Sequence, residues 1–220
     1  GRFPAAGLGD RRVSERLSKG ARQLPEGWTE APFSEIAELL RGVSYEKEVA
    51  RDTAQEGYCP ILRATNIQDG RLVLDSELVY VPHDYVSTEQ RLRPGDIVIC
   101  MSSGSKELVG KTGQLTRPWC GSFGAFCAAA RFYEQVDSRF AGYFFTCSQY
   151  RDTVRDRSSG VNINNLRRGD IEAIGLPLPP LREQRRIADT IDTEFARLDA
   201  AVAAMERTQA NLQRYRSSVL

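Results

Sequence analysis

The chain has 220 residues, of which 41% are hydrophobic and 27% charged, and its formal net charge at pH 7 is +1. That length suits one core-forming domain with an appendage, and the near-neutral charge excludes a protein that coats nucleic acid with a uniformly basic surface. No apolar run approaches the roughly 20 residues of a membrane-spanning helix, so we expect a cytoplasmic protein with no membrane partner.

Residues 1–23 carry six basic and two acidic side chains but no apolar stretch. A secretory leader needs an apolar centre, so we expect a flexible basic tail or an expression remnant outside the fold. The five cysteines lack the close spacing of zinc ligands, and there is only one histidine. We therefore predict free thiols, no metal site and no cofactor in this chain.

The segment 24–75 opens an α+β domain with a mixed sheet, because strand and helix patterns follow one another without regular alternation. A short strand around Trp28 precedes a helix that is capped by Ser34 and stopped at Gly42. Residues 58–75 predict two strands, with Asp69-Gly70 as the hairpin turn between them.

Residues 94–180 complete this domain. The expected elements are a buried strand through 97–99, a strand within 123–133, one helix of about 18 residues within 137–156, a short helix capped near Asn164 or Asn165, and a strand at 175–180. Prolines end that last strand and fix the direction in which the chain leaves it. We therefore place the domain at 24–180.

Residues 181–220 contain no glycine or proline and predict one continuous helix of roughly 55 Å. From Phe195 onward its apolar residues are alternately three and four apart, interrupted at Gln209 and Arg216. This is the heptad spacing of a coiled coil, and the helix is too long to be covered by its own domain, so we predict a partner helix. The predicted helix-pairing residues are Ile187, Ile191, Phe195, Leu198, Val202, Met205, Leu212 and Val219.

The sequence lacks the patterns of an enzyme. Residues 104–112 (GSKELVGKT) do not form a phosphate-binding loop, because Ser105 stands where that motif requires glycine. There is no Asn/Asp-Pro-Pro-aromatic run for methyl transfer, and the single histidine, His83, is not part of a recognisable hydrolytic triad. We therefore predict a binding protein.

Four stretches resemble the specificity subunits of type I restriction-modification systems: LPEGW, MSSGSKELVGKTG, LPLPPLREQRRIADTID and NLQRYRSSVL. The resemblance covers residues 24–220, and Pro180 to Ile187 is its most distinctive part. It implies a non-catalytic subunit whose target-recognition domain reads one half of a split DNA site. It also implies that the long helix pairs antiparallel with a second helix and sets the distance between half-sites.

The partners implied by the resemblance are double-stranded DNA, the methyltransferase subunits and, through them, the restriction and translocase subunit. The family usually has two recognition domains and two helices, whereas this chain has one of each. We therefore expect a half-subunit or a fragment, which forms a homodimer of halves or pairs with a second half-subunit.

Three predicted loops, at 41–48, 101–113 and 155–168, carry side chains suited to DNA. Hydroxyl and N–H groups suit phosphate oxygens, while Asn and Arg can pair with adenine and guanine. The third loop is the strongest candidate, because five Arg and only two Asp lie between Arg151 and Arg168. The predicted DNA-contact residues are Arg41, Ser44, Lys47, Arg63, Asn66, Ser103, Ser105, Lys106, Lys111, Arg155, Arg157, Asn162, Asn164, Asn165, Arg167 and Arg168.

Two other interpretations stay open at the level of sequence. The chain could be the recognition region of a single-chain restriction-methylation enzyme whose catalytic part lies elsewhere. It could also be a coiled-coil adaptor whose globular domain binds protein, and a sequence-dependent complex with DNA would separate that adaptor from a recognition subunit. Each polar loop residue can, moreover, be a solvated side chain or a cap.

Overall fold

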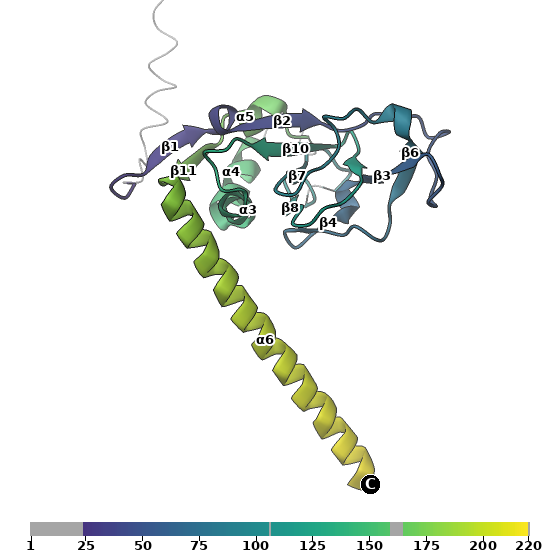
Figure 1. Ribbon diagram of the computed structural model, residues 1–220, viewed down its shortest axis with the longest axis vertical. Helices are drawn as coiled ribbons and strands as arrows, with labels where there is room; N and C mark the ends of the chain where they lie inside the picture. Colours follow the sequence, from purple (N-terminus) through teal and green to yellow (C-terminus); the bar gives the residue numbers. More distant parts are fainter. Residues whose placement is uncertain (1–23, 106, 159–164, 220) are drawn as a thin grey trace, which may run out of the picture.

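The computed structural model describes residues 24–105, 107–158 and 165–219. Residues 24–180, which we call the head, contain three small sheets and short helices, and α6 (Leu181–Val219) projects from them as a single long rod (Figure 1). The α+β class with mixed sheets and the long C-terminal helix are therefore confirmed. The predicted tail at residues 1–23 lies outside the described residues.

A six-stranded mixed sheet forms the centre of the head. Its strands run in the order β2 (Ala37–Arg41), β10 (Cys127–Phe132), β7 (Ile97–Cys100), β8 (Thr112–Gln114), β5 (Arg71–Leu72) and β4 (Ile67–Gln68). All neighbours are antiparallel except β5 and β8. Because β7 is buried throughout, its continuous apolar run suits a strand covered on both faces. The buried strand predicted through 97–99 is confirmed.

Two smaller sheets complete the head. Three strands pair as β6 (Val79–Pro82), β3 (Tyr58–Leu62) and β9 (Ser122–Phe123), with β3 and β9 parallel. The strand β1 (Thr29–Pro32) pairs antiparallel with β11 (Gly175–Leu178). The pairing of β1 with β11 places the start of the head close to the first turn of α6, because Thr29 lies opposite Leu178.

The hairpin prediction at Asp69-Gly70 is confirmed. Both residues have positive φ angles, 49° and 78°, and they join β4 to β5. A two-residue turn with both central residues in this region matches the twist of paired strands, which explains the Asp-Gly sequence there.

The predicted helix after Ser34 is wrong beyond its first turn. The helix α2 spans only Phe33–Ile36, and β2 begins at Ala37. All five residues of β2 pair with β10, which buries Leu39 and Leu40. Sheet pairing therefore overrides a local pattern that suits a helix.

The single helix predicted within 137–156 is also wrong, because two helices occupy it: α3 (Ser138–Thr146) and α4 (Ser148–Ser158). The chain is extended between them at Cys147, with ψ of 161°. On one continuous helix Phe145 and Tyr150 would lie about 140° apart. The break brings their ring centroids to 4.8 Å in one core.

The last short helix, α5 (Arg168–Glu172), starts later than predicted. Arg167 occupies the N-cap position, and its N–H donates to the Asp170 carboxylate at 2.8 Å. Of the two predicted caps, Asn165 forms an isolated bridge with Ser102 instead, and Asn164 lies outside the described residues. Two 3₁₀ turns, η1 (Ala64–Asn66) and η2 (His83–Tyr85), complete the described elements.

Several ionisable groups of the head are buried. The carboxylate of Asp96, 2% exposed, accepts a hydrogen bond from Arg131 Nη2 at 2.7 Å. Cys100 and Cys127 lie opposite each other on β7 and β10, and burial raises their thiol pKa values to about 11 and about 12. Within the described ranges we find no cluster of metal-binding side chains and no helix long and apolar enough to cross a membrane.

Candidate nucleic-acid interface

A tight turn at residues 124–127 lies at the centre of the candidate interface. The N–H of Cys127 donates to Gly124 O at 2.8 Å, which leaves Ala125 and Phe126 at the tip. The Phe126 side chain is 71% exposed. An exposed aromatic ring on such a turn can contact a binding partner. The residue types on the neighbouring segments indicate what kind of partner that is.

The predicted loop 41–48 lies on one side of this turn. The N–H of Val43 donates to Phe123 O at 2.7 Å, and the N–H of Ala125 donates back to Val43 O at 2.9 Å. This approach needs glycine, because a Cβ on Gly42 would lie 2.2 Å from Gly124 O. The backbone therefore fixes the loop 41–48 against the turn.

The other two predicted loops lie on the opposite side. The N–H groups of Met101 and Ser102 both donate to Phe126 O, at 2.9 and 3.0 Å. The N–H of Leu166 in turn donates to Met101 O at 2.7 Å, and Ser102 forms a bridge with Asn165. A continuous series of backbone contacts thus joins all three loops around Phe126, although they are far apart in sequence.

Arg63 lies beside the same surface, because the backbone oxygen of Leu62 before it accepts from the N–H of Gly124 at 2.9 Å. Its Nη2 donates to Glu77 O at 3.1 Å. Burial raises the pKa of the Tyr45 hydroxyl, and the nearby positive charge of Arg63 opposes that shift. Tyr45 also borders the turn, since its Cε1 lies 3.9 Å from the position of a Cβ on Gly124. The predicted residues that are exposed on these segments are Arg41, Ser44, Lys47, Arg63, Ser105, Asn165, Arg167 and Arg168.

Two predicted DNA contacts have structural roles. Asn66 is only 1% exposed; its Oδ1 accepts from the N–H of Arg63 at 2.8 Å and its Nδ2 donates to Ser76 O at 2.8 Å. Arg157 donates to the backbone oxygens of Asp170 and Ala173, both at 3.0 Å, at the end of α5. We therefore leave Asn66 and Arg157 out of the candidate surface.

The remaining predicted residues are less central. Ser103 is half-buried and its hydroxyl accepts from the N–H of Ser105 at 3.2 Å, while Lys111, in the same predicted loop, is also half-buried. Arg155 is exposed on α4 and pairs with Asp152 at 2.9 Å; Arg168 pairs with Glu172 at 2.6 Å. Lys106, Asn162 and Asn164 lie outside the described residues.

Phe126 was missed by the sequence analysis, although a signal was present. It is the one bulky residue in the stretch GAF, between two strands and in a turn that otherwise holds small residues. Sequence alone could not link it to the polar loops, because the contacts that do so are long-range.

The predicted helix-pairing residues divide into two groups. Ile187 and Ile191 are half-buried near the head, and Phe195 stacks on Tyr143 with ring centroids 6.1 Å apart. The side chains of Leu198, Val202, Met205 and Leu212 are 57%, 45%, 71% and 59% exposed. The side chain of Val219 lies outside the described residues.

The molecule thus combines an α+β head, on which polar loops converge, with a long projecting helix. Residues 25–211 match the family described as "Type I restriction modification DNA specificity domain", and the chain belongs to this family.

The relatives bear the same description. The chain is 42% identical over 198 residues to the type I restriction enzyme StySPI specificity subunit of Salmonella potsdam, covering 90% of this chain and 42% of that protein. It is 42% identical over 200 residues to the EcoKI specificity subunit of Escherichia coli (strain K12), covering 91% and 43%. The chain thus spans less than half the length of these curated relatives.

A solved structure supports the fold. A chain from a study of complex assembly and conformational transition of the type I R-M system superposes with a TM-score of 0.66 at 21% identity. The match covers 93% of this chain and 47% of that chain. The head and projecting helix therefore recur together in a distant sequence.

Proposed function

We propose that this chain is a non-catalytic DNA-recognition subunit, or a part of one, in a type I restriction-modification enzyme, and that it reads one half of a split DNA site. The observation that carries the proposal is the convergence of three predicted loops on the turn that displays Phe126. In this proposal the chain holds no cofactor of its own, and we keep the division at residues 24–180 and 181–220.

The proposed contacts combine phosphate binding with base reading. Arg63 and Arg167 are exposed cations on opposite sides of the turn and suit phosphate oxygens or guanine. Arg63 uses only Nη2 for one backbone oxygen, that of Glu77, whereas Arg157 binds two. Asn165 offers the amide that pairs with adenine, and the ring of Phe126 can contact a thymine methyl group. The flanking contacts in this proposal are Arg41, Ser44, Lys47, Ser103, Ser105, Lys111, Arg155 and Arg168.

We further propose that α6 pairs antiparallel with a second helix, from another copy of the chain or from a second half-subunit. The support is its exposed apolar series, from Leu198 to Leu212, at heptad spacing. The assembled frame would carry the methyltransferase subunits and, through them, the restriction and translocase subunit. The similarity to specificity subunits of type I restriction enzymes supports this assignment.

The proposal predicts that loss of a surface cation weakens binding in a salt-dependent manner. The chain is combined with its methyltransferase subunits, and a duplex is chosen from split adenine-methylated motifs in the host methylome. Arg63→Ala and Arg167→Ala should each lower affinity by about tenfold, and a lost phosphate contact should reduce the slope of log K against log salt by about 1. Phe126→Ala should instead reduce the preference for the cognate duplex.

Arg197→Ala is the matched control, because Arg197 is an exposed cation on α6 that pairs with Glu194 at 2.7 Å. It should leave affinity and slope unchanged. If all three interface variants behave like this control, the surface around Phe126 is not the DNA site.

A further inference from the structure

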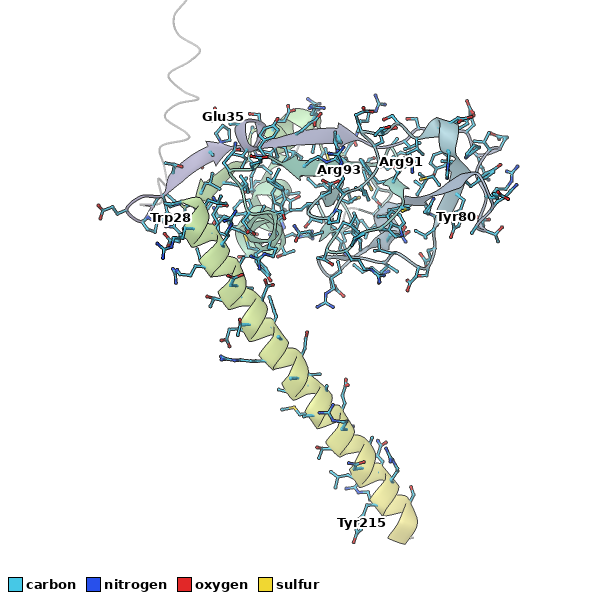
Figure 2. The ribbon with its side chains drawn as sticks, viewed as in Figure 1. Trp28, Glu35, Tyr80, Arg91, Arg93 and Tyr215 are labelled. Carbon is cyan, nitrogen blue, oxygen red and sulfur yellow. The ribbon has the colours of Figure 1, made fainter. Side chains whose placement is uncertain are left out.

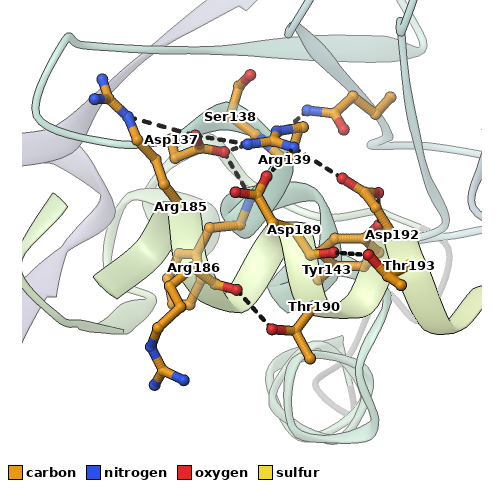
Figure 3. A network of polar contacts seen from close by, with 12 residues as sticks. Asp137, Ser138, Arg139, Tyr143, Arg185, Arg186, Asp189, Thr190, Asp192 and Thr193 are labelled. Atoms are coloured by element: carbon orange, nitrogen blue, oxygen red, sulfur yellow. Dashed lines mark hydrogen bonds and ion pairs between the residues drawn. The ribbon is translucent and has the colours of Figure 1, made fainter. Parts of the chain in front are cut away.

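The first turns of α6 contact the head along one stripe, whereas the large apolar residues from Leu198 to Leu212 are exposed. Gln184 and Ala188 are 1% and 0% exposed. The charged groups Asp189 and Asp192 continue this stripe toward Phe195 and face α3 (Figure 3). We call residues 181–195 the proximal part of α6 and residues 196–219 the distal part.

Gln184 fixes the origin of the helix. Its Oε1 accepts from the N–H of Asp137 at 2.8 Å, and its Nε2 donates to Pro179 O and Gln135 O at 2.9 and 3.2 Å. Every hydrogen-bonding atom of the buried amide is used. A side chain held in this manner acts as a pivot, because the backbone around it cannot slide without losing buried hydrogen bonds.

Arg139 of α3 contacts α6 about two turns beyond Gln184 and holds the direction of the helix. Its Nη1 contacts Asp189 Oδ1 at 2.8 Å and Asp192 Oδ2 at 2.9 Å (Figure 3). Its Nη2 lies 3.5 Å from Asp137 Oδ2, the carboxylate that caps α3. One guanidinium therefore ties two turns of α6 to the start of α3.

Tyr143 adds a second tie one turn along α3. Its hydroxyl donates to Asp192 Oδ1, and its ring stacks on Phe195 at an interplanar angle of 24°. Burial and the Asp192 carboxylate raise the pKa of Tyr143 to about 12, so the hydroxyl stays protonated and remains a donor at neutral pH. Phe195 thus contacts the head although it is 53% exposed.

The distal part then acts as a lever. Phe195 lies roughly 16 Å from Gln184 along the helix axis, and Val219 lies roughly 52 Å from it, at 1.5 Å per residue. A displacement of about 1 Å at Phe195 therefore becomes about 3 Å at Val219. That distance is close to one base-pair step of roughly 3.4 Å along DNA. A small displacement of α6 relative to α3 therefore moves the far end of the helix by about one base pair.

We propose that Arg139, Tyr143 and Phe195 are positioning residues that set the angle of α6 and thereby the number of base pairs accepted between two half-sites. The inference rests on the proposed function, since it needs a second head at the other end of the paired helices. It adds a determinant that helix length alone does not supply, because a helix of fixed length with a loose angle spans a range of distances.

The chemistry of the contact suits adjustment of an angle better than maintenance of the fold. The side chains of Arg139, Asp189 and Asp192 are 44%, 67% and 46% exposed, and ion pairs at such exposure are individually weak and screened by salt. Their loss leaves the buried Gln184 contacts in place. The head should therefore stay folded while the direction of α6 becomes less defined.

The angle is measured first in the chain alone. Dyes are attached at Asp75→Cys on the head and Gln213→Cys on α6, in a Cys120→Ser and Cys147→Ser background, and the labelled chain is diluted into unlabelled chain. The double variant Arg139→Gln, Tyr143→Phe should broaden the single-molecule energy-transfer distribution. Arg139→Lys should recover part of the narrow wild-type distribution. Arg197→Gln is the control, since its ion pair lies within α6.

The spacing is measured next in the assembled enzyme. Duplexes carry the two half-sites separated by the native spacer or by one or two base pairs more or fewer. The wild type should discriminate strongly between them. The double variant should lose at least fivefold of that discrimination while its affinity for the native spacer changes less than threefold, a pattern that a merely unstable head would not give.

The outcomes separate this inference from the proposed function. If the double variant keeps the wild-type energy-transfer width, or broadens it yet keeps the wild-type spacer preference, the positioning role is wrong and DNA recognition stands. If the wild-type assembly shows no sequence-dependent binding to the duplex, the proposed function fails and the spacing role fails with it.

Discussion

The proximal and distal parts of α6 form one helix but differ in what covers them. In the proximal part, Gln184 and Ala188 are buried and two carboxylates pair with Arg139 of the head. In the distal part the large apolar residues are exposed, and Figure 2 shows its side chains, as far as Tyr215, extending from a rod with no head element beside it.

The comparison separates two tasks that the sequence places on one helix. Polar contacts of defined geometry hold a direction, because hydrogen bonds and ion pairs are directional. An apolar series at heptad spacing drives association with another helix, because pairing with a helix of the same spacing buries apolar surface and is therefore favourable. The proximal part therefore orients the rod and the distal part recruits its partner.

The largest expected effect is the loss of association when charge enters the distal apolar series. Leu198→Asp together with Val202→Asp should weaken self-association of the chain by at least about 100-fold, because two carboxylates would have to be buried in the helix pair. Sedimentation equilibrium at micromolar concentration measures this directly.

Ala196→Asp together with Ala200→Asp is the matched control. These residues have the same spacing and the same added charge but lie on the opposite side of the helix, and both are exposed. This control should associate like the wild type. Equal behaviour of the two double variants would show that the apolar series is not the contact surface.

A smaller effect is expected at the pivot. Gln184→Ala should lower the free energy of unfolding by about 2–3 kcal/mol, because it leaves the N–H of Asp137 and two backbone oxygens buried without partners. Gln213→Ala removes an exposed glutamine from the distal part and should change it by less than about 0.5 kcal/mol. Urea denaturation followed by circular dichroism compares the two, and equal losses would remove the special role of Gln184.

The long helix was predictable because its determinants are local. The absence of glycine and proline, the heptad spacing and the prolines before Leu181 all lie within about 45 residues. The two helices that the sequence misplaced depend on distant partners instead. Residues 37–41 form a strand because β10, about 90 positions later, offers an edge, and α3 ends at Thr146 because Tyr150 has to reach the same core as Phe145.

The candidate interface was predictable in composition but not in arrangement. The sequence identified three polar loops by residue type, and the structure joins them through backbone contacts of Val43, Met101 and Leu166. The sequence could not show that the Asn66 amide makes all its hydrogen bonds within the head. A buried asparagine and a base-reading asparagine can have the same local sequence. The importance of Phe126 depends on these same long-range contacts.

The central claim is that the distal part of α6 pairs antiparallel with a second helix of the same kind. Pulsed electron paramagnetic resonance tests it with one spin label per chain at Asp199→Cys, Glu206→Cys or Gln213→Cys, in a Cys120→Ser and Cys147→Ser background. These positions lie one heptad apart on one side of the helix. Antiparallel pairing predicts distances within the dimer that change by about 21 Å per heptad away from the crossing point, which is twice the rise of seven residues. The same distance at all three sites would contradict antiparallel pairing, and no dipolar coupling at any of them would contradict pairing between two copies of the chain.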